Sequence, residues 1–141
     1  MKLVLPVLLL ATLSSCATKL PEFKINRVCS FEAIRYLKNP RNKSKQRNVS
    51  PALVTAMAGT QKNMQLCYED FKLRTGILEF DTCLVVGVDE AGKTEFFNFS
   101  SRQVKLDRSF INCAQAVTKS VPFSIYGNNF VLVQAYQFYF D

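Results

Sequence analysis

Five cysteines constrain this chain more than any other feature, because each disulfide would join two segments that are distant in sequence. They stand at Cys16, Cys29, Cys67, Cys83 and Cys113, and an odd number cannot all pair within one chain. No spacing is C-x-x-C and no two cysteines lie close together, which disfavours thiol redox chemistry and a four-cysteine zinc site. One cysteine should therefore have a different role from the other four.

The first sixteen residues explain the odd cysteine. Met1-Lys2 precedes an apolar run from Leu3 to Leu13, which is too short for a bilayer core that needs about 20 residues. The end of this run, Leu13-Ser14-Ser15-Cys16, resembles the bacterial lipobox, in which the cysteine is acylated with fatty acids such as palmitate. An ordinary secretory signal with Cys16 as a chance thiol is the alternative. We predict a signal peptide over 1–15, lipidation at Cys16 and a place in the bacterial envelope, facing the periplasm or surface. Ala17 favours the outer membrane.

Catalysis is not expected, since the chain contains no histidine. Ser-His-Asp and Cys-His nucleophile systems and His-ligated zinc are thereby excluded. Neighbouring acids at 69/70, 79/81 and 89/90 fall on a helix end, an exposed strand face and a turn, which are solvated positions and not a glycosidase carboxylate pair. We therefore expect no enzyme activity, no cofactor and no bound metal.

Positive charge is concentrated near the N-terminus. Residues 17–48 carry nine Lys or Arg and two acids, whereas residues 49–141 carry eight bases and nine acids. The segment 39–48 contains no hydrophobic residue and is typical of a solvated loop. The predicted basic patch consists of Lys38, Arg41, Lys43, Lys45 and Arg47. It would contact anionic lipid headgroups, lipopolysaccharide or an acidic partner, or else serve as a soluble spacer. Nucleic acid is not expected for an exported chain.

Hydrophobic periodicity predicts an α+β body of α-β-β-α-β order, preceded by a short strand over 23–29 and a helix over 30–38. Ser50-Pro51 should begin a long helix that ends at Gly76, in which Gly59 either introduces a kink or allows a close backbone approach. Strands are expected over 78–88 and 93–100 with a turn at 89–92. A helix from 107 to about 120 and a strand over 130–140 complete the body. The expected domains are the signal peptide, a lipid-anchored basic arm over 16–48 and a folded domain over 49–141.

The last strand should lie at an edge of the sheet. The helix from 107 to about 120 returns the chain before the last strand. An antiparallel sheet made of the strands over 78–88, 93–100 and 130–140 therefore requires the order second, first, last, and the two helices of the body lie on one face. The strand is apolar on both faces, and a long apolar edge invites pairing with another chain. The residues predicted to bind a partner are Phe130, Leu132, Gln134, Tyr136, Phe138 and Phe140.

Several motifs in this order resemble a TonB C-terminal-type domain, most closely its AgmX/PglI C-terminal subgroup. They are the helical Gln65-Leu66-Cys67-Tyr68-Glu69, the turn Val88-Asp89-Glu90-Ala91-Gly92, the helical Phe110-Ile111-Asn112-Cys113, and Val121-Pro122-Phe123 before the final strand. The resemblance covers about residues 50–141 and implies recognition of a partner by this fold. The chain departs from energy-transducing members, because it shows no inner-membrane helix and no proline-rich spacer, so energy transduction is not expected.

Four cysteines remain after Cys16, and they allow three connectivities. Cys67 and Cys113 each fall on the core-facing side of a helix, and both helices should pack on one sheet face. We therefore predict Cys67–Cys113, with Cys29–Cys83 as the remaining pair that fastens the basic arm to the first strand.

Two functions are compatible with these features. The favoured one is a non-catalytic, lipid-anchored binding module that recognises an envelope protein, or a second copy of itself, by strand addition at the last strand. The other is a passive structural subunit of an envelope assembly for motility, transport or predation. An enzyme-inhibitor lipoprotein is a third and weaker reading.

Overall fold

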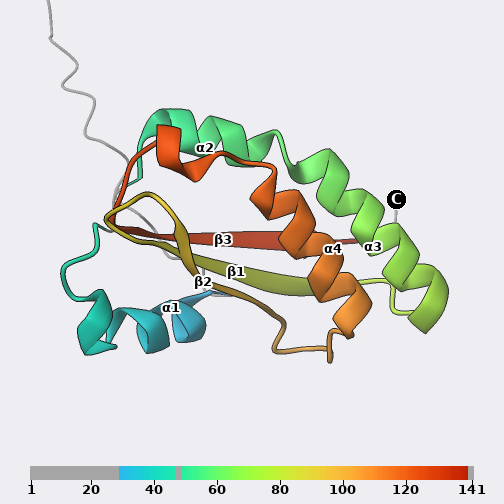
Figure 1. Ribbon diagram of the computed structural model, residues 1–141. Helices are drawn as coiled ribbons and strands as arrows, with labels where there is room; N and C mark the ends of the chain where they lie inside the picture. Colours follow the sequence, from blue (N-terminus) through green and yellow to red (C-terminus); the bar gives the residue numbers. More distant parts are fainter. Residues whose placement is uncertain (1–28, 47–48, 140–141) are drawn as a thin grey trace, which may run out of the picture.

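The computed structural model describes residues 29–46 and 49–139, and Figure 1 shows how their elements are arranged. The elements in chain order are α1 (Ser30–Leu37), the 3₁₀ helix η1 (Pro40–Asn42), α2 (Pro51–Ala58), α3 (Gln61–Thr75), β1 (Phe80–Val88), β2 (Thr94–Ser100), α4 (Arg108–Lys119), the 3₁₀ helix η2 (Phe123–Ile125) and β3 (Phe130–Phe138). Residues 23–28 of the strand predicted over 23–29, the signal peptide and Cys16 lie outside the described residues.

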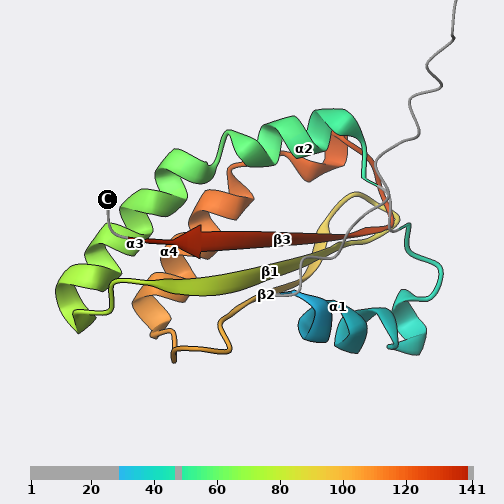
Figure 2. The ribbon, with the colours of Figure 1, turned by 180° about the vertical axis from the view of Figure 1, so that it is seen from behind.

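The sheet is antiparallel with the order β2-β1-β3, which confirms the predicted topology and the α+β class. β1 pairs with β3 along its whole length, from Phe80 opposite Phe138 to Val88 opposite Phe130. Helices α2, α3 and α4 cover one face, while α1 lies against the other, and Figure 2 shows the same arrangement from behind. The sheet is therefore the middle layer of the domain.

The long helix predicted from residue 50 to 75 is wrong in one respect, since it is divided into α2 and α3. Ser50 accepts a hydrogen bond from the Leu53 N–H and begins α2 as expected (3.2 Å). After Gly59, the Thr60 N–H bonds the Met57 carbonyl three residues back, and its Oγ1 donates to that same oxygen (2.6 Å). Both bonds tighten the turn and end α2, because a threonine hydroxyl competes with the regular helical pattern.

The predicted boundaries of the other elements hold closely. Gly76 takes a positive φ of 71° and closes α3, a conformation that glycine adopts without steric cost. Asp107 caps α4 by accepting from the Phe110 N–H (2.8 Å). Leu78, the first residue of the strand predicted over 78–88, instead precedes β1 and is exposed.

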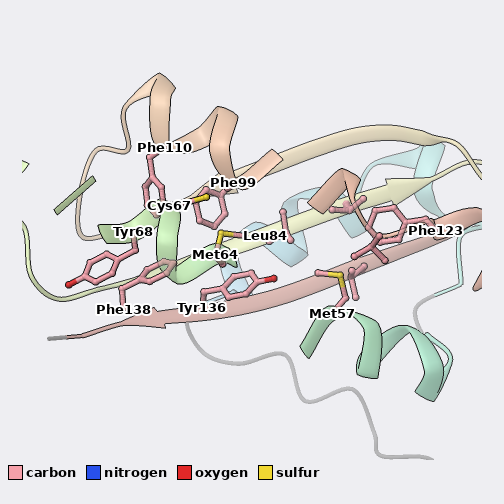
Figure 3. Packing of buried hydrophobic residues seen from close by; sticks show 14 of the residues in the cluster. Met57, Met64, Cys67, Tyr68, Leu84, Phe99, Phe110, Phe123, Tyr136 and Phe138 are labelled. Atoms are coloured by element: carbon pink, nitrogen blue, oxygen red, sulfur yellow. The ribbon is translucent and has the colours of Figure 1, made fainter. Parts of the chain in front are cut away.

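The main core lies between the sheet and helices α2–α4 (Figure 3). Aromatic rings dominate it: Phe71 stacks on Phe110 at 4.8 Å between centroids, and Tyr68 stacks on Phe138 at 5.0 Å. The first strand contributes every second residue, as its alternation predicted. This side of β3 is thus fully engaged in packing.

A smaller cluster occupies the opposite face, beneath α1. Cys83 and Val85 of β1 pack there with Val131 and Val133 of β3. Tyr36 of α1 stacks on Phe96 of β2 with centroids 4.9 Å apart. A Cβ at Gly87 would lie 2.1 Å from the Phe96 ring, so this glycine leaves the room that the ring needs.

Candidate functional site

β3 is one of the two edge strands of the sheet, β2 being the other, and the free side of β3 is partly covered by the chain itself. Gln46 pairs with the start of the strand: its N–H bonds the Asn129 carbonyl (2.8 Å), and its carbonyl accepts from the Val131 N–H (3.0 Å). This contact is parallel and limited to one residue. Among the described residues, nothing else pairs along the rest of this edge.

The exposed backbone groups follow from the alternation of a β-strand. Since the Val131 N–H points away from β1 toward Gln46, the backbone groups of Val133, Ala135 and Gln137 point the same way. The Gln134 side chain donates to the Ala135 carbonyl (3.1 Å) and partly satisfies it. We call this outward row of backbone groups, from Val133 to Gln137, the β3 edge.

A groove of about 520 Å³ lies beside the far half of the β3 edge. Residues 135–138 of β3 and Tyr139 after it form one wall, and Gln61, Lys62 and Gln65 of α3 form the other. The α3 wall is polar and presents amide and ammonium groups. An extended peptide in this groove could bond the strand backbone and place alternate side chains against α3.

The side chains predicted to bind a partner are placed differently from expectation. Phe130, Leu132, Tyr136 and Phe138 are all buried in the main core, so they hold the strand in place and present nothing to a partner. Gln134 is half-buried, and Phe140 lies outside the described residues. The binding capacity of β3 therefore resides in its outward backbone groups, and Gln137 is the exposed side chain of the strand.

The Tyr136 side chain lies behind the groove. Its hydroxyl is 3.2 Å from Thr60 Oγ1, at the junction of α2 and α3. Burial raises the pKa of Tyr136 above its usual range, while the hydrogen bond with Thr60 lowers it to a smaller extent. The hydroxyl accordingly remains protonated at neutral pH and links the helix junction to the edge strand.

The predicted basic patch requires a correction, because Lys45 is not solvated. Its side chain is buried, and Nζ bonds the Val88 carbonyl (2.8 Å) and the Glu95 carboxylate (2.8 Å), with Asn129 Oδ1 at 3.5 Å. The loop that carries it is also ordered, because Asn42 is buried and donates to the Tyr36 carbonyl (2.9 Å). A buried ammonium needs such acceptors, and the turn at Asn129 and the end of β1 supply them. Lys45 therefore holds the basic segment against the sheet.

The other members of the patch remain at the surface where they are described. Lys38, Arg41 and Lys43 are exposed, and Arg47 lies outside the described residues. Exposed Arg35 of α1, which was not among the predicted members, belongs with them because it lies three residues before Lys38.

Both predicted disulfides are present in the structure. Cys67 of α3 is bonded to Cys113 of α4, with Cα atoms 5.7 Å apart. Cys29, directly before α1, is bonded to Cys83 on the outer face of β1, with Cα atoms 5.2 Å apart. One bridge joins the two long helices, and the other fastens the basic segment to the central strand.

An ion-pair cluster joins α3 to the start of α4. Arg74 Nε donates to Asp70 (2.9 Å), and its guanidinium also pairs with Asp107. Burial opposes ionisation of Asp107, but its bonds from the Phe110 N–H and Arg74 outweigh this and lower its pKa. The cluster is at the surface and has a structural role.

Within the described part of the chain, no three His, Cys, Asp or Glu side chains gather in a way that could hold a metal ion. In the same residues, no helix is both long enough and apolar enough to cross a membrane. Comparison of the chain with protein-family models, with curated proteins and with solved structures finds no match.

Proposed function

We propose that this chain is a non-catalytic, lipid-anchored binding module of the bacterial envelope. It takes up an extended segment of a protein partner, or of a second copy of itself, as an added strand at the β3 edge. The observation that carries the proposal is the juxtaposition of outward backbone groups at Val133–Gln137 with the groove beside α3. Anchoring rests on the lipobox-like residues before Cys16.

The resemblance to TonB C-terminal-type domains agrees with this mode of recognition. Strand addition gains backbone hydrogen bonds along the edge, and its specificity comes from the pockets that alternate side chains enter. The polar α3 wall, with Gln61, Lys62 and Gln65, favours a segment whose inward side chains can hydrogen-bond or carry negative charge. Energy transduction is not part of the proposal.

The pairing of Gln46 with Asn129 and Val131 favours the second candidate, a passive structural subunit. The chain already covers one end of the edge itself, as a protein does when it protects a strand from pairing. In that case the remaining groups at Val133–Gln137 would be left to solvent or to fixed neighbours.

Crosslinking in the native envelope separates these candidates. A photoreactive residue at Lys62, in the groove wall, should capture a partner, whereas the same residue at Lys93, in the turn at the other end of the sheet, should not. Mass analysis of the product identifies a second copy or another protein.

A matched pair of variants tests whether the backbone is what binds. Gln137→Pro removes the outward N–H, and proline is tolerated on an edge strand where the N–H faces away from the sheet. Gln137→Ala removes the side chain but keeps that N–H. Capture at Lys62 should be lost with proline and retained with alanine. Equal capture by both variants, or by Lys62 and Lys93, would overturn strand addition and favour a passive subunit.

A further inference from the structure

Helix α1 and the residue directly after it present one aromatic and two basic side chains to solvent. Phe31, Arg35 and Lys38 follow one another at spacings of four and three, which places them on one helical face. Phe31 is 58% exposed although it is apolar, and Arg35 and Lys38 are exposed as well. Tyr36 points the other way, where it stacks on Phe96 of the sheet.

Cations continue from this helix on both sides. The guanidinium of Arg102, in the loop after β2, lies 5.3 Å from the centre of the Phe31 ring. Arg41 and Lys43 extend the row through η1, whose first turn is capped by the Asn39 side chain bonding the Arg41 N–H (3.1 Å). We call this surface the basic face; its members are Phe31, Arg35, Lys38, Arg41, Lys43 and Arg102.

The charge of the basic face is not neutralised locally. No ion pair is formed by its five cations among the described residues. The only acid between Cys29 and Gln46 in the sequence is Glu32, and the nearby Glu95 is already bonded to Lys45. An exposed cationic surface with an aromatic ring at its edge fits a partner that has a dense negative charge at its surface and an apolar layer beneath that charge.

We propose that the basic face is a docking surface for the anionic phospholipid headgroups of a bilayer. Lys and Arg attract phosphate at an anionic membrane, and an exposed ring beside them can enter the boundary between headgroups and acyl chains. A soluble polyanion would satisfy the cations but would leave Phe31 in water. This combination favours a bilayer over an acidic protein.

The distance from the anchor also favours the bilayer. This step rests on the proposed lipidation, because Cys16 precedes Cys29 by 13 residues. A chain of that length spans at most about 45 Å when fully extended. The disulfide at Cys29 fixes the end of this tether beside α1, so an acylated protein would hold its basic face close to the membrane throughout.

Docking in this way sets the orientation of the domain. α1 lies on the sheet face opposite α2, α3 and α4 (Figures 1 and 2). With α1 on the membrane, α3 faces away from it, and the groove between α3 and β3 stays open to the aqueous side. The two surfaces can thus be occupied at the same time.

The test uses the mature protein with Cys16→Ser, which cannot be acylated, so that headgroup contact is measured apart from anchoring. Flotation with phosphatidylcholine vesicles, with and without phosphatidylglycerol, reports the binding. We expect binding only when phosphatidylglycerol is present, with affinity falling as salt is added. Each of Lys38→Gln, Arg41→Gln and Lys43→Gln should weaken it about fivefold, and the triple variant about a hundredfold.

The matched control removes the same charge from the other side of the sheet, with Lys62→Gln, Arg108→Gln and Lys119→Gln on α3 and α4. All of these side chains are exposed, so neither triple variant should unfold the domain. The control should bind nearly as well as the parent. Equal losses for the two triple variants would show general charge attraction and overturn the assigned face.

Phe31→Ala separates a bilayer from a soluble polyanion. It should weaken vesicle binding without changing the affinity for soluble polyglutamate. Absence of vesicle binding by the parent protein, or an unchanged vesicle affinity with Phe31→Ala, would overturn bilayer docking. Partner capture at Lys62 by the acylated protein does not depend on these outcomes, so failure of docking and failure of strand addition are distinguishable.

Discussion

Replacing Gly87 with alanine should force apart the packing beneath α1. The new Cβ would lie 2.1 Å from Cε1 of Phe96, whereas non-bonded carbons rest at about 3.5–4.0 Å. Movement of the ring is restricted, because Tyr36 stacks on it with centroids 4.9 Å apart. Either the strand or the ring must move by more than about 1 Å, and overpacking of this kind costs about 1–3 kcal/mol.

A double-mutant cycle with Phe96→Ala makes this reasoning refutable. The single variant Phe96→Ala should lose about 2 kcal/mol, through the stack with Tyr36 and the buried part of the ring. Once the ring is absent, Gly87→Ala meets no obstacle and should be neutral or slightly stabilising. Urea unfolding of the parent, both single variants and the double variant gives the coupling energy, which we expect to be about 1–3 kcal/mol. Additivity within about 0.5 kcal/mol would refute the steric account.

Three further predictions concern the stability of the fold. Replacing Cys29 and Cys83 by alanine should lower the free energy of unfolding by about 4 kcal/mol, because the bridge closes a loop with a sequence separation of 54. Hydrogen exchange should rise in α1 before it rises in α3. A loss of less than about 1 kcal/mol would contradict the prediction. Lys45→Met should cost about 2 kcal/mol in urea unfolding, since the Val88 carbonyl loses a charged donor, whereas Lys43→Met at an exposed position should cost almost nothing. Asp107→Ala should cost about 1 kcal/mol through the lost cap, and Asp107→Asn much less. Because the fold lowers the pKa of Asp107, its carboxylate stabilises the protein above about pH 4, and this contribution is lost as the pH falls through the lowered pKa. Asp107→Asn should therefore flatten the acid side of a curve of stability against pH. An unchanged curve would contradict the role given to the Asp107 carboxylate.

The sheet and its order could be predicted from local patterns. Alternation in the first strand and the apolar run at residues 130–138 mark strands, Gly76 and Asp107 mark helix ends, and the direction of the returning helix leaves one strand order. The disulfides followed from the helix faces that carry Cys67 and Cys113. The strands, the helix ends and the core-facing helix sides depend on neighbours within about ten residues, and the strand order and the Cys67–Cys113 pair follow from them although their partners are distant in sequence.

The features that could not be predicted depend on distant partners. Lys45 sits in a run of polar and basic residues, and nothing in that run indicates that Val88 and Glu95 would surround its ammonium group. Thr60 ends α2 partly because Tyr136 faces it from the edge strand. The apolar residues of β3 predict a contact surface, but the alternate side chains of this strand fill two cores on opposite faces of the sheet. Only the three-dimensional arrangement separates a strand that is apolar for packing from one that is apolar for binding.

The bridge between Cys29 and Cys83 also determines how the molecule would carry a mechanical load. Cys83 lies on β1 directly opposite Ala135 of β3, next to the β3 edge. In an anchored protein that holds a partner at this edge, tension from the membrane would enter β1 through the disulfide. It would then cross to β3 through the nine residue pairs that join the two strands. Helices α1 to α4 lie outside this path. A pull on the anchor would thus strain the sheet, where many hydrogen bonds share the force, and leave the helical layer and its core unstretched.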